Sequence, residues 1–158
     1  MEVKLFDELL PIENNMSIAE KKDRILKELS EIHDTDSRYR LIIAKGRALP
    51  DLIDAERQDK FLIAGCLSRA WLVPAMSGGK VLFKADSEAA IVKGIMAILV
   101  EVYSGNAPQE ILGLSPDFLK EGGISEHLSM NRRNGLSSFV KQIMLYAAVF
   151  QSLGSVNK

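Results

Sequence analysis

Apolar residues recur at helical spacing near the start of the chain. Ser17 followed by Glu20 forms a capping box, and one face of the segment after it is apolar: Ile18, Ile25, Leu26, Leu29 and Ile32. The pattern predicts a first helix from about Ile18 to Ile32. A second helix is expected after Asp34-Thr35-Asp36, which supplies a turn and an N-cap, and Gly46 can close it in the left-handed conformation.

The pattern changes after Phe61, where the spacing of apolar residues becomes typical of strands. Residues 69–76 are rich in strand formers, and Ser77-Gly78-Gly79 is a hairpin turn signal. Lys80 to Ala85 follows with Val81, Phe83 and Ala85 alternating against the other three residues. This predicts two antiparallel strands, with a third strand near Phe61 to Ile63.

The second half of the chain is helical in pattern. The most apolar long segment, Ala89 to Tyr103, is shorter than an ordinary membrane span and contains Lys93 and Glu101, so it predicts a buried helix. Asp86 or Ser87 is expected to cap this helix, and Ser104-Gly105 to end it.

Two short helices and one long helix are expected after it. Pro108 and Pro116 each suit the first turn of a short helix. A last helix is predicted from about Asn134 to Phe150, and its expected core-facing residues are Leu136, Phe139, Ile143, Tyr146 and Phe150. Helices, then a small antiparallel sheet, then helices give an α+β fold.

Composition bounds the kind of protein. With 158 residues and 47% apolar content, one domain with a sizeable core is expected. Twenty Lys and Arg against 21 Asp and Glu give a formal net charge of -1. No overall field suited to nucleic acid or an anionic membrane is therefore expected, although local patches remain possible.

The inventory of thiols and imidazoles is small. The chain holds one cysteine, Cys66, and two histidines, His33 and His127, far apart and without ligand spacing, so no metal site is expected. One cysteine forms no intramolecular disulfide, and Glu2 and Asp7 stand where a secretory peptide would be basic and apolar. A reducing cytoplasm is the expected location.

The lone cysteine raises a question of chemistry. A free cysteine is most often a small buried hydrophobe, and that interpretation stays open for Cys66. Cys66 falls in the loop that enters the predicted sheet, however, and Gly65 before it lacks a Cβ, so another molecule's backbone can approach the thiol. These neighbours favour a chemical role modestly.

Three segments resemble motifs of the SufE family of sulfur-acceptor proteins. They are Gly65-Cys66-Leu67-Ser68-Arg69-Ala70-Trp71-Leu72, Asp86-Ser87-Glu88-Ala89-Ala90-Ile91-Val92-Lys93-Gly94 and Arg132-Arg133-Asn134-Gly135-Leu136. The match in order and spacing extends from about Ile25 to Ala147. The family usually has Gln where Leu67 stands, and a leucine cannot make the polar contacts that a Gln side chain would make.

The resemblance implies a SufE/IscU-like α+β fold, with a small three-stranded antiparallel sheet packed against several helices. Residues 17–158 would form the single domain, and residues 1–16 an N-terminal extension outside the resemblance, either a short partner-binding helix or a disordered tail. Met16 is an alternative start of the chain.

The resemblance also implies a function. Members accept sulfur from the persulfide of a pyridoxal-phosphate-dependent cysteine desulfurase, stimulate that enzyme, and pass the sulfur to an iron-sulfur assembly scaffold. Cys66 would be the acceptor, and no cofactor is needed, because one nucleophilic thiolate suffices. The chain would be an accessory protein rather than a stand-alone enzyme, and a monomer or a homodimer.

Further site residues follow from the same resemblance. Arg132 is the best candidate for stabilising a thiolate or contacting the partner, with Arg69 a weaker one. The expected partner-binding residues are Gly65, Ser68, Asp86, Ser87 and Glu88. For Asp86 and Ser87 a plain capping role explains the residue types equally well, and Trp71 is expected in the core.

Two other function classes stay open. An iron-sulfur scaffold is one, although a single cysteine cannot hold a cluster within a monomer. A non-catalytic interaction domain with an inert, buried Cys66 is the other.

Overall fold

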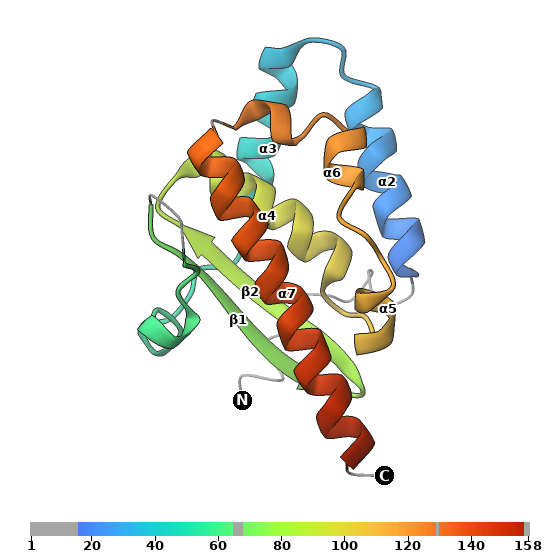
Figure 1. Ribbon diagram of the computed structural model, residues 1–158. Helices are drawn as coiled ribbons and strands as arrows, with labels where there is room; N and C mark the ends of the chain where they lie inside the picture. Colours follow the sequence, from blue (N-terminus) through green and yellow to red (C-terminus); the bar gives the residue numbers. More distant parts are fainter. Residues whose placement is uncertain (1–15, 65–67, 129, 157–158) are drawn as a thin grey trace.

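A β-hairpin and the helices packed on it make up the fold of the computed structural model (Figure 1), which describes residues 16–64, 68–128 and 130–156, without the side chains of residues 130–132 and 155–156. The helix α4 (Ala90–Tyr103) lies at the centre and contacts both the hairpin and other helices. The class is α+β, as the pattern predicts.

Two capped helices begin the described chain. Helix α2 (Ile18–Ser30) starts after Ser17, whose Oγ accepts a hydrogen bond from the backbone N–H of Glu20 at 3.1 Å. Helix α3 (Thr35–Arg47) starts after Asp34, whose carboxylate accepts from the N–H of Ser37 at 2.9 Å. Both predicted caps are confirmed.

Gly46 does not end α3 in the left-handed conformation, so that expectation is wrong. It lies inside the helix, and a Cβ at this position would come within 2.7 Å of the Gly94 nitrogen of α4. A Cβ at Gly94 would lie 2.2 Å from the Ile42 carbonyl oxygen. The two glycines are therefore needed for the close crossing of α3 and α4.

The hairpin consists of β1 (Ala70–Ser77) and β2 (Lys80–Ser87). Gly78 and Gly79, with φ of 57° and 78°, make the two-residue turn, in agreement with the predicted turn signal. Alternate residues of β1 face opposite sides: Ala70 and Leu72 join the main core, and Trp71 and Val73 join a smaller cluster with Leu52. The structure confirms that Trp71 is a buried residue.

The third strand is not formed in the described chain, so the sheet has two strands instead of three. Residues Asp54–Glu56 and Asp59–Phe61 form the short 3-10 helices η2 and η3 instead. Only one bridge, from Leu62 to Trp71, follows η3 along the edge of β1. Residues Asp59–Phe61, which would have lengthened a strand, instead form the tight turn of η3.

Helix α4 is nearly all buried, as its composition predicts. Its N-cap residue is Ala89, which makes no side-chain cap, so neither Asp86 nor Ser87 is the N-cap. Both end β2 instead, and the Ser87 Oγ accepts a hydrogen bond from the N–H of Ala89 at 3.2 Å. Gly105, with φ of 82°, turns the chain after α4.

The remaining helices are α5 (Pro108–Leu112), α6 (Phe118–Glu121), the 3-10 turn η4 (Ser125–His127) and α7 (Met130–Val156). Pro108 begins α5 as expected, whereas Pro116 lies in the turn before α6. Helix α7 extends beyond both predicted ends and packs on α5, β1 and α4. None of the described helices combines the length and apolar character that a membrane span needs.

Candidate functional site

The first and second motif segments meet just before the N-terminal end of α4, and the third packs against α4 itself. Gly65, Cys66 and Leu67 lie outside the described residues, and the chain resumes at Ser68, whose side chain is partly exposed. The hairpin places Ser68 and Arg69 beside the end of β2, because Ala70 pairs with Ser87. The first and second motif segments are therefore neighbours.

Arg69 and Glu88 connect these two segments directly. The Arg69 backbone N–H and Nε donate to Glu88 Oε1 at 3.1 and 3.3 Å, and Arg69 Nη2 donates to Oε2 at 3.2 Å. The Glu88 N–H donates in return to the Arg69 carbonyl oxygen at 3.0 Å. These hydrogen bonds lower the pKa of Glu88 and raise the pKa of Arg69, so both stay charged at neutral pH.

This pairing was missed from the sequence, although a signal existed. A two-residue turn at Gly78-Gly79 pairs Ser77 with Lys80, and the same register continued along the hairpin puts residue 69 opposite residue 88. Counting the strand register outward from the turn would have placed Arg69 opposite Glu88.

Asp86 and Ser87 are both buried, with 6% and 7% of their surface exposed. The Asp86 carboxylate bonds Arg57 Nη2 at 2.6 Å, Lys93 Nζ at 3.2 Å and the Ser87 N–H at 2.8 Å. Its oxygens are thus occupied by groups of this chain. The partner-binding role expected for Asp86 and Ser87 stays a prediction.

Arg57 is a second residue that sequence reasoning missed. Its guanidinium lies 5.3 Å from the centre of the Trp71 ring, and that of Arg69 lies 5.5 Å from it. Trp71 is thus held by two cations, one of which also pairs with Asp86. Arg57 sits in irregular chain after η2, where no periodic pattern could have placed it.

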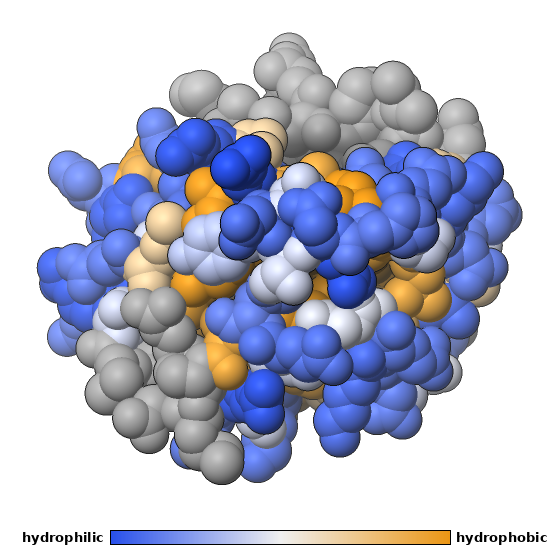
Figure 2. Space-filling model, turned by 90° about the horizontal axis from the view of Figure 1, so that it is seen from above, coloured by the Kyte–Doolittle hydropathy of each residue, from blue (hydrophilic) through white to orange (hydrophobic). Residues whose placement is uncertain are grey.

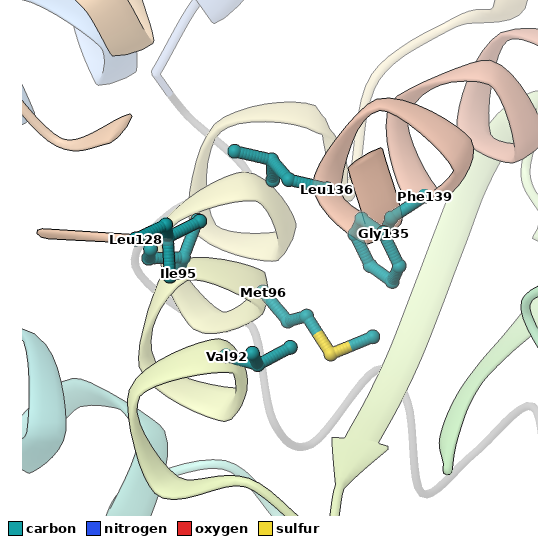
Figure 3. A pocket seen from close by; sticks show the side chains of 7 residues that line it. All are labelled: Val92, Ile95, Met96, Leu128, Gly135, Leu136 and Phe139. Atoms are coloured by element: carbon teal, nitrogen blue, oxygen red, sulfur yellow. The ribbon is translucent and has the colours of Figure 1, made fainter. Parts of the chain in front are cut away.

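The second and third motif segments share a small apolar pocket (Figure 3). Val92, Ile95 and Met96 of α4 line it on one side. Leu128 and the α7 residues Gly135, Leu136 and Phe139 line the rest. The pocket has a volume of about 10 Å³, at the lower limit of what a single water needs, and all of its described lining residues are uncharged.

Arg132 stands one turn before Gly135 in α7, so its backbone is close to this pocket, and its side chain is outside the described residues. The structure therefore places the backbone of the third motif segment against α4. The role expected for Arg132 stays a prediction.

Within residues 16–64, 68–128 and 130–156, no three His, Cys, Asp or Glu side chains gather where they could hold a metal ion. On the end of the molecule that Figure 2 shows, hydrophilic residues cover most of the described surface and hydrophobic residues show through in separate small areas. The described residues at that end form no broad apolar face.

The fold and the site define a small α+β protein in which the second motif segment adjoins the described end of the first and shares a pocket with the third. Residues 23–147 match the family SufE, described as an Fe-S metabolism associated domain. The chain belongs to the SufE family, which associates it with iron-sulfur metabolism.

Individual relatives agree with this assignment. An uncharacterised SufE-like protein of Rhizobium etli is 38% identical over 132 residues, covering 80% of this chain and 89% of the relative. An uncharacterised SufE-like protein of Synechocystis is 28% identical over 137 residues, covering 87% of this chain and 86% of the relative. The resemblance read from the three motifs is thereby confirmed.

A solved structure has a similar fold. The solution structure of a hypothetical protein from Thermus thermophilus superposes with a TM-score of 0.72 at 18% identity, covering 84% of this chain and 96% of that one. At this identity the similarity concerns the fold alone.

Proposed function

We propose that this protein accepts sulfur from a pyridoxal-phosphate-dependent cysteine desulfurase onto Cys66, stimulates that enzyme, and hands the sulfur to iron-sulfur cluster assembly. The observation that supports the proposal is that Arg69 and Glu88 join the cysteine-bearing first motif segment to the second, which in turn shares an apolar pocket with the third. Family membership supplies the metabolic context.

The transfer is a single nucleophilic displacement. The Cys66 thiolate attacks the terminal sulfur of the donor cysteine persulfide, a new S–S bond forms on Cys66, and the donor's S–S bond breaks. The donor cysteine leaves as a thiolate, so one negative charge enters and one leaves. No redox partner is consumed, because the persulfide sulfur already carries the required oxidation level.

Residues of this chain have distinct parts in the proposal. Ser68, with Gly65, shapes the end of the loop that must meet the donor, and exposed Glu88 offers a surface for the desulfurase. Asp86 and Ser87 support that surface from within the fold. Arg132 stabilises the sulfur anion through a charge-assisted hydrogen bond.

Having one cysteine suits a carrier. A second thiol nearby would attack the bound persulfide and discharge its sulfur as hydrogen sulfide, leaving a disulfide. Since Cys66 is the sole cysteine of the chain, the cargo has no such internal exit. The sulfur is then passed to an acceptor thiol on the cluster-assembly scaffold.

The test is the intact mass of the protein after incubation with a cysteine desulfurase and cysteine. The expected result is the gain of sulfur by the wild type and none by Cys66→Ser. A wild type that gains no sulfur, while the desulfurase turns over normally, contradicts the proposal and favours an interaction domain with an inert thiol. Equal gain by Cys66→Ser contradicts it as well.

A further inference from the structure

A short segment before the first motif covers the outer face of the hairpin. Trp71 and Val73 point away from the main core and pack with Leu52 in the smaller apolar cluster. Figure 1 shows the segment that contains η2 and η3, in teal and green, beside the hairpin. We term residues 52–62 the strap, because contacts along its length join it to this face of the hairpin.

Two consecutive strap residues pair with two alternate residues of β2. Both carboxylate oxygens of Glu56 accept hydrogen bonds from Lys84 Nζ at 3.1 Å, and both side chains are buried. Arg57 Nη2 lies 2.6 Å from Asp86 Oδ2. Residues 84 and 86 face the same side of the strand, so an acid and a base on the strap meet a base and an acid on β2 in matching order. The first of these pairs already joins the strap to the hairpin.

The second pair does more than neutralise a buried charge. Lys93 Nζ lies 3.2 Å from Asp86 Oδ1, and the Ser87 N–H donates to the same oxygen at 2.8 Å. A buried carboxylate with a cation and an N–H donor is already compensated. Arg57 is a second cation on this carboxylate, and 34% of its side chain stays exposed. Charge compensation of Asp86 alone therefore does not account for Arg57.

Arg57 also contacts the side chain of Trp71. Its Cζ lies 5.3 Å from the centre of the Trp71 ring, and Arg69 Cζ lies 5.5 Å from it. Trp71 is buried, and its indole N–H has no hydrogen-bond partner in the described part of the chain. A ring without a hydrogen bond takes its orientation from packing and, at Trp71, from these two guanidinium groups.

The same contacts lead from the strap to an exposed ion pair. Arg69, on one side of the ring's environment, donates from Nε and Nη2 to the Glu88 carboxylate at 3.3 and 3.2 Å. Hydrogen bonds from Arg69 are the main cause that lowers the pKa of Glu88, and the positive charge of Arg57 lowers it further. Arg57 is therefore near enough to influence both members of the group that the strap supports.

We propose that Arg57 is a positioning residue for the docking of the desulfurase. It holds the ring of Trp71 in place. The ring in turn supports Arg69, which keeps Glu88 in the orientation that meets the partner. The inference rests on the proposed function, in which Glu88 offers a surface for the desulfurase. It concerns the docking step and not the transfer of sulfur.

The first measurement uses the isolated protein. Trp71 is the sole tryptophan of the chain, so the fluorescence emission of tryptophan reports on this ring. In Arg57→Gln, the emission should shift to longer wavelength and become easier to quench with acrylamide, because the ring gains contact with water. Lys60→Gln is the matched control, since Lys60 Nζ lies in the same strap 5.0 Å from the centre of a different ring, that of Phe61. This control should leave the emission unchanged.

The second measurement is the rate of a cysteine desulfurase at increasing concentrations of this protein. Arg57→Gln should raise the half-saturating concentration about fivefold, which corresponds to about 1 kcal/mol, and leave the limiting rate unchanged. Arg57→Lys restores a charge beside Asp86 and should recover most of the loss. Lys60→Gln should behave as the wild type. Arg57→Met, which keeps the aliphatic stem, replaces Arg57→Gln if that variant does not fold.

Several results overturn the proposal. Wild-type emission in Arg57→Gln does so, even with a raised half-saturating concentration, because Arg57 would then contact the partner directly. An unchanged half-saturating concentration, or a loss confined to the limiting rate, also overturns it. Equal effects of Arg57→Gln and Lys60→Gln overturn it in favour of a general effect of charge.

Failure of the proposed function gives a different result. A wild-type protein that does not stimulate the desulfurase contradicts the proposed function. The emission measurement needs no partner, so it still decides whether Arg57 positions Trp71.

Discussion

Arg69 and Glu88 hold each other through both backbone and side-chain hydrogen bonds. Three donors of Arg69 reach the Glu88 carboxylate at 3.1, 3.2 and 3.3 Å, and the Glu88 N–H returns a bond of 3.0 Å. Because Arg69 stands three residues after Cys66 in the sequence, Glu88 fixes one end of the cysteine-bearing segment to the start of α4. A change at Glu88 should therefore be measured at the thiol.

The first prediction is that Glu88→Gln raises the alkylation rate of Cys66 by a few-fold. The amide keeps the shape of the side chain and weakens the charge-assisted bonds to Arg69. The matched control is Glu126→Gln, at an exposed residue in η4 that is far along the sequence from the first two motif segments. An unchanged rate in Glu88→Gln, with both variants folded, would mean that this contact does not restrain the segment.

The second prediction concerns pH. The pKa of Glu88 is lowered from 4.5 in the fold, chiefly by hydrogen bonds from Arg69. The stabilising effect of the contact is therefore fully present above pH 4.5 and is lost as the pH falls through the lowered value. In an NMR titration, the Arg69 amide proton should keep its shift to below pH 4.5 and move only in stronger acid. Movement centred above that value contradicts the geometry.

The sequence predicts the regular elements well because their patterns are local. The caps Ser17 and Asp34, the turn at Gly78-Gly79 and the buried α4 all follow from residues within a few positions of one another. The family likewise follows from three short segments. Local patterns therefore establish the fold class and the candidate thiol.

What the sequence does not reveal depends on contacts between distant segments. The edge strand near Phe61 fails because η3 turns the chain before a ladder can form. The described contacts with β1 are one bridge from Leu62 to Trp71 and one hydrogen bond from the Ile63 N–H to the Ala70 carbonyl oxygen. The Arg57 contacts with Asp86 and Trp71 join irregular chain to the hairpin. Such contacts become visible only when the three-dimensional packing is known.

The third prediction concerns Gly94, which lies at the close crossing of α3 and α4. Gly94→Ala should lower the free energy of unfolding by about 1–3 kcal/mol or more, since its Cβ would lie 2.2 Å from the Ile42 carbonyl oxygen. Gly154→Ala is the control, because it is a helical glycine with open space around it. Urea unfolding should show this control unchanged or slightly stabilised. If both variants unfold alike, the close crossing is not the reason for glycine at 94.

Arg132 carries the fourth prediction. Arg132→Ala should fold normally and accept sulfur several-fold more slowly, because a guanidinium near the sulfur anion cannot lose its proton at neutral pH. Arg133→Ala is the matched control: Arg133 is exposed and its Nε donates to the Ser125 carbonyl oxygen at 3.0 Å, a contact within the fold. Single-turnover transfer from a persulfidated desulfurase measures both. Equal rates for wild type and Arg132→Ala, with equal partner affinity, would return Arg132 to a plain surface charge.

The last prediction concerns how the thiol is presented to its donor. Apolar residues just beyond both ends of the segment are buried: Ile63, Ala70 and Trp71 have 7%, 0% and 4% of their surface exposed, whereas Ala64 and Arg69 between them are exposed. A thiol covered by apolar groups is shielded from stray reductants. Its thiolate form is disfavoured there, because the negative charge loses its hydration. We expect Cys66 to react slowly with an alkylating reagent in the isolated protein.

Docking on the desulfurase should then expose the thiol. The partner need only favour an open form of the segment by about 1.4 kcal/mol to change the ratio of open to closed forms tenfold. The measurement is the alkylation rate of Cys66 alone and with a desulfurase whose own active cysteine has been replaced, without substrate. A rate about tenfold faster in the complex is expected. Glu88→Gln should reduce this difference between the free and bound rates, because in that variant residue 88 no longer restrains the segment through Arg69. Equal rates at a partner concentration that saturates binding would show that the cysteine is presented before the partner arrives.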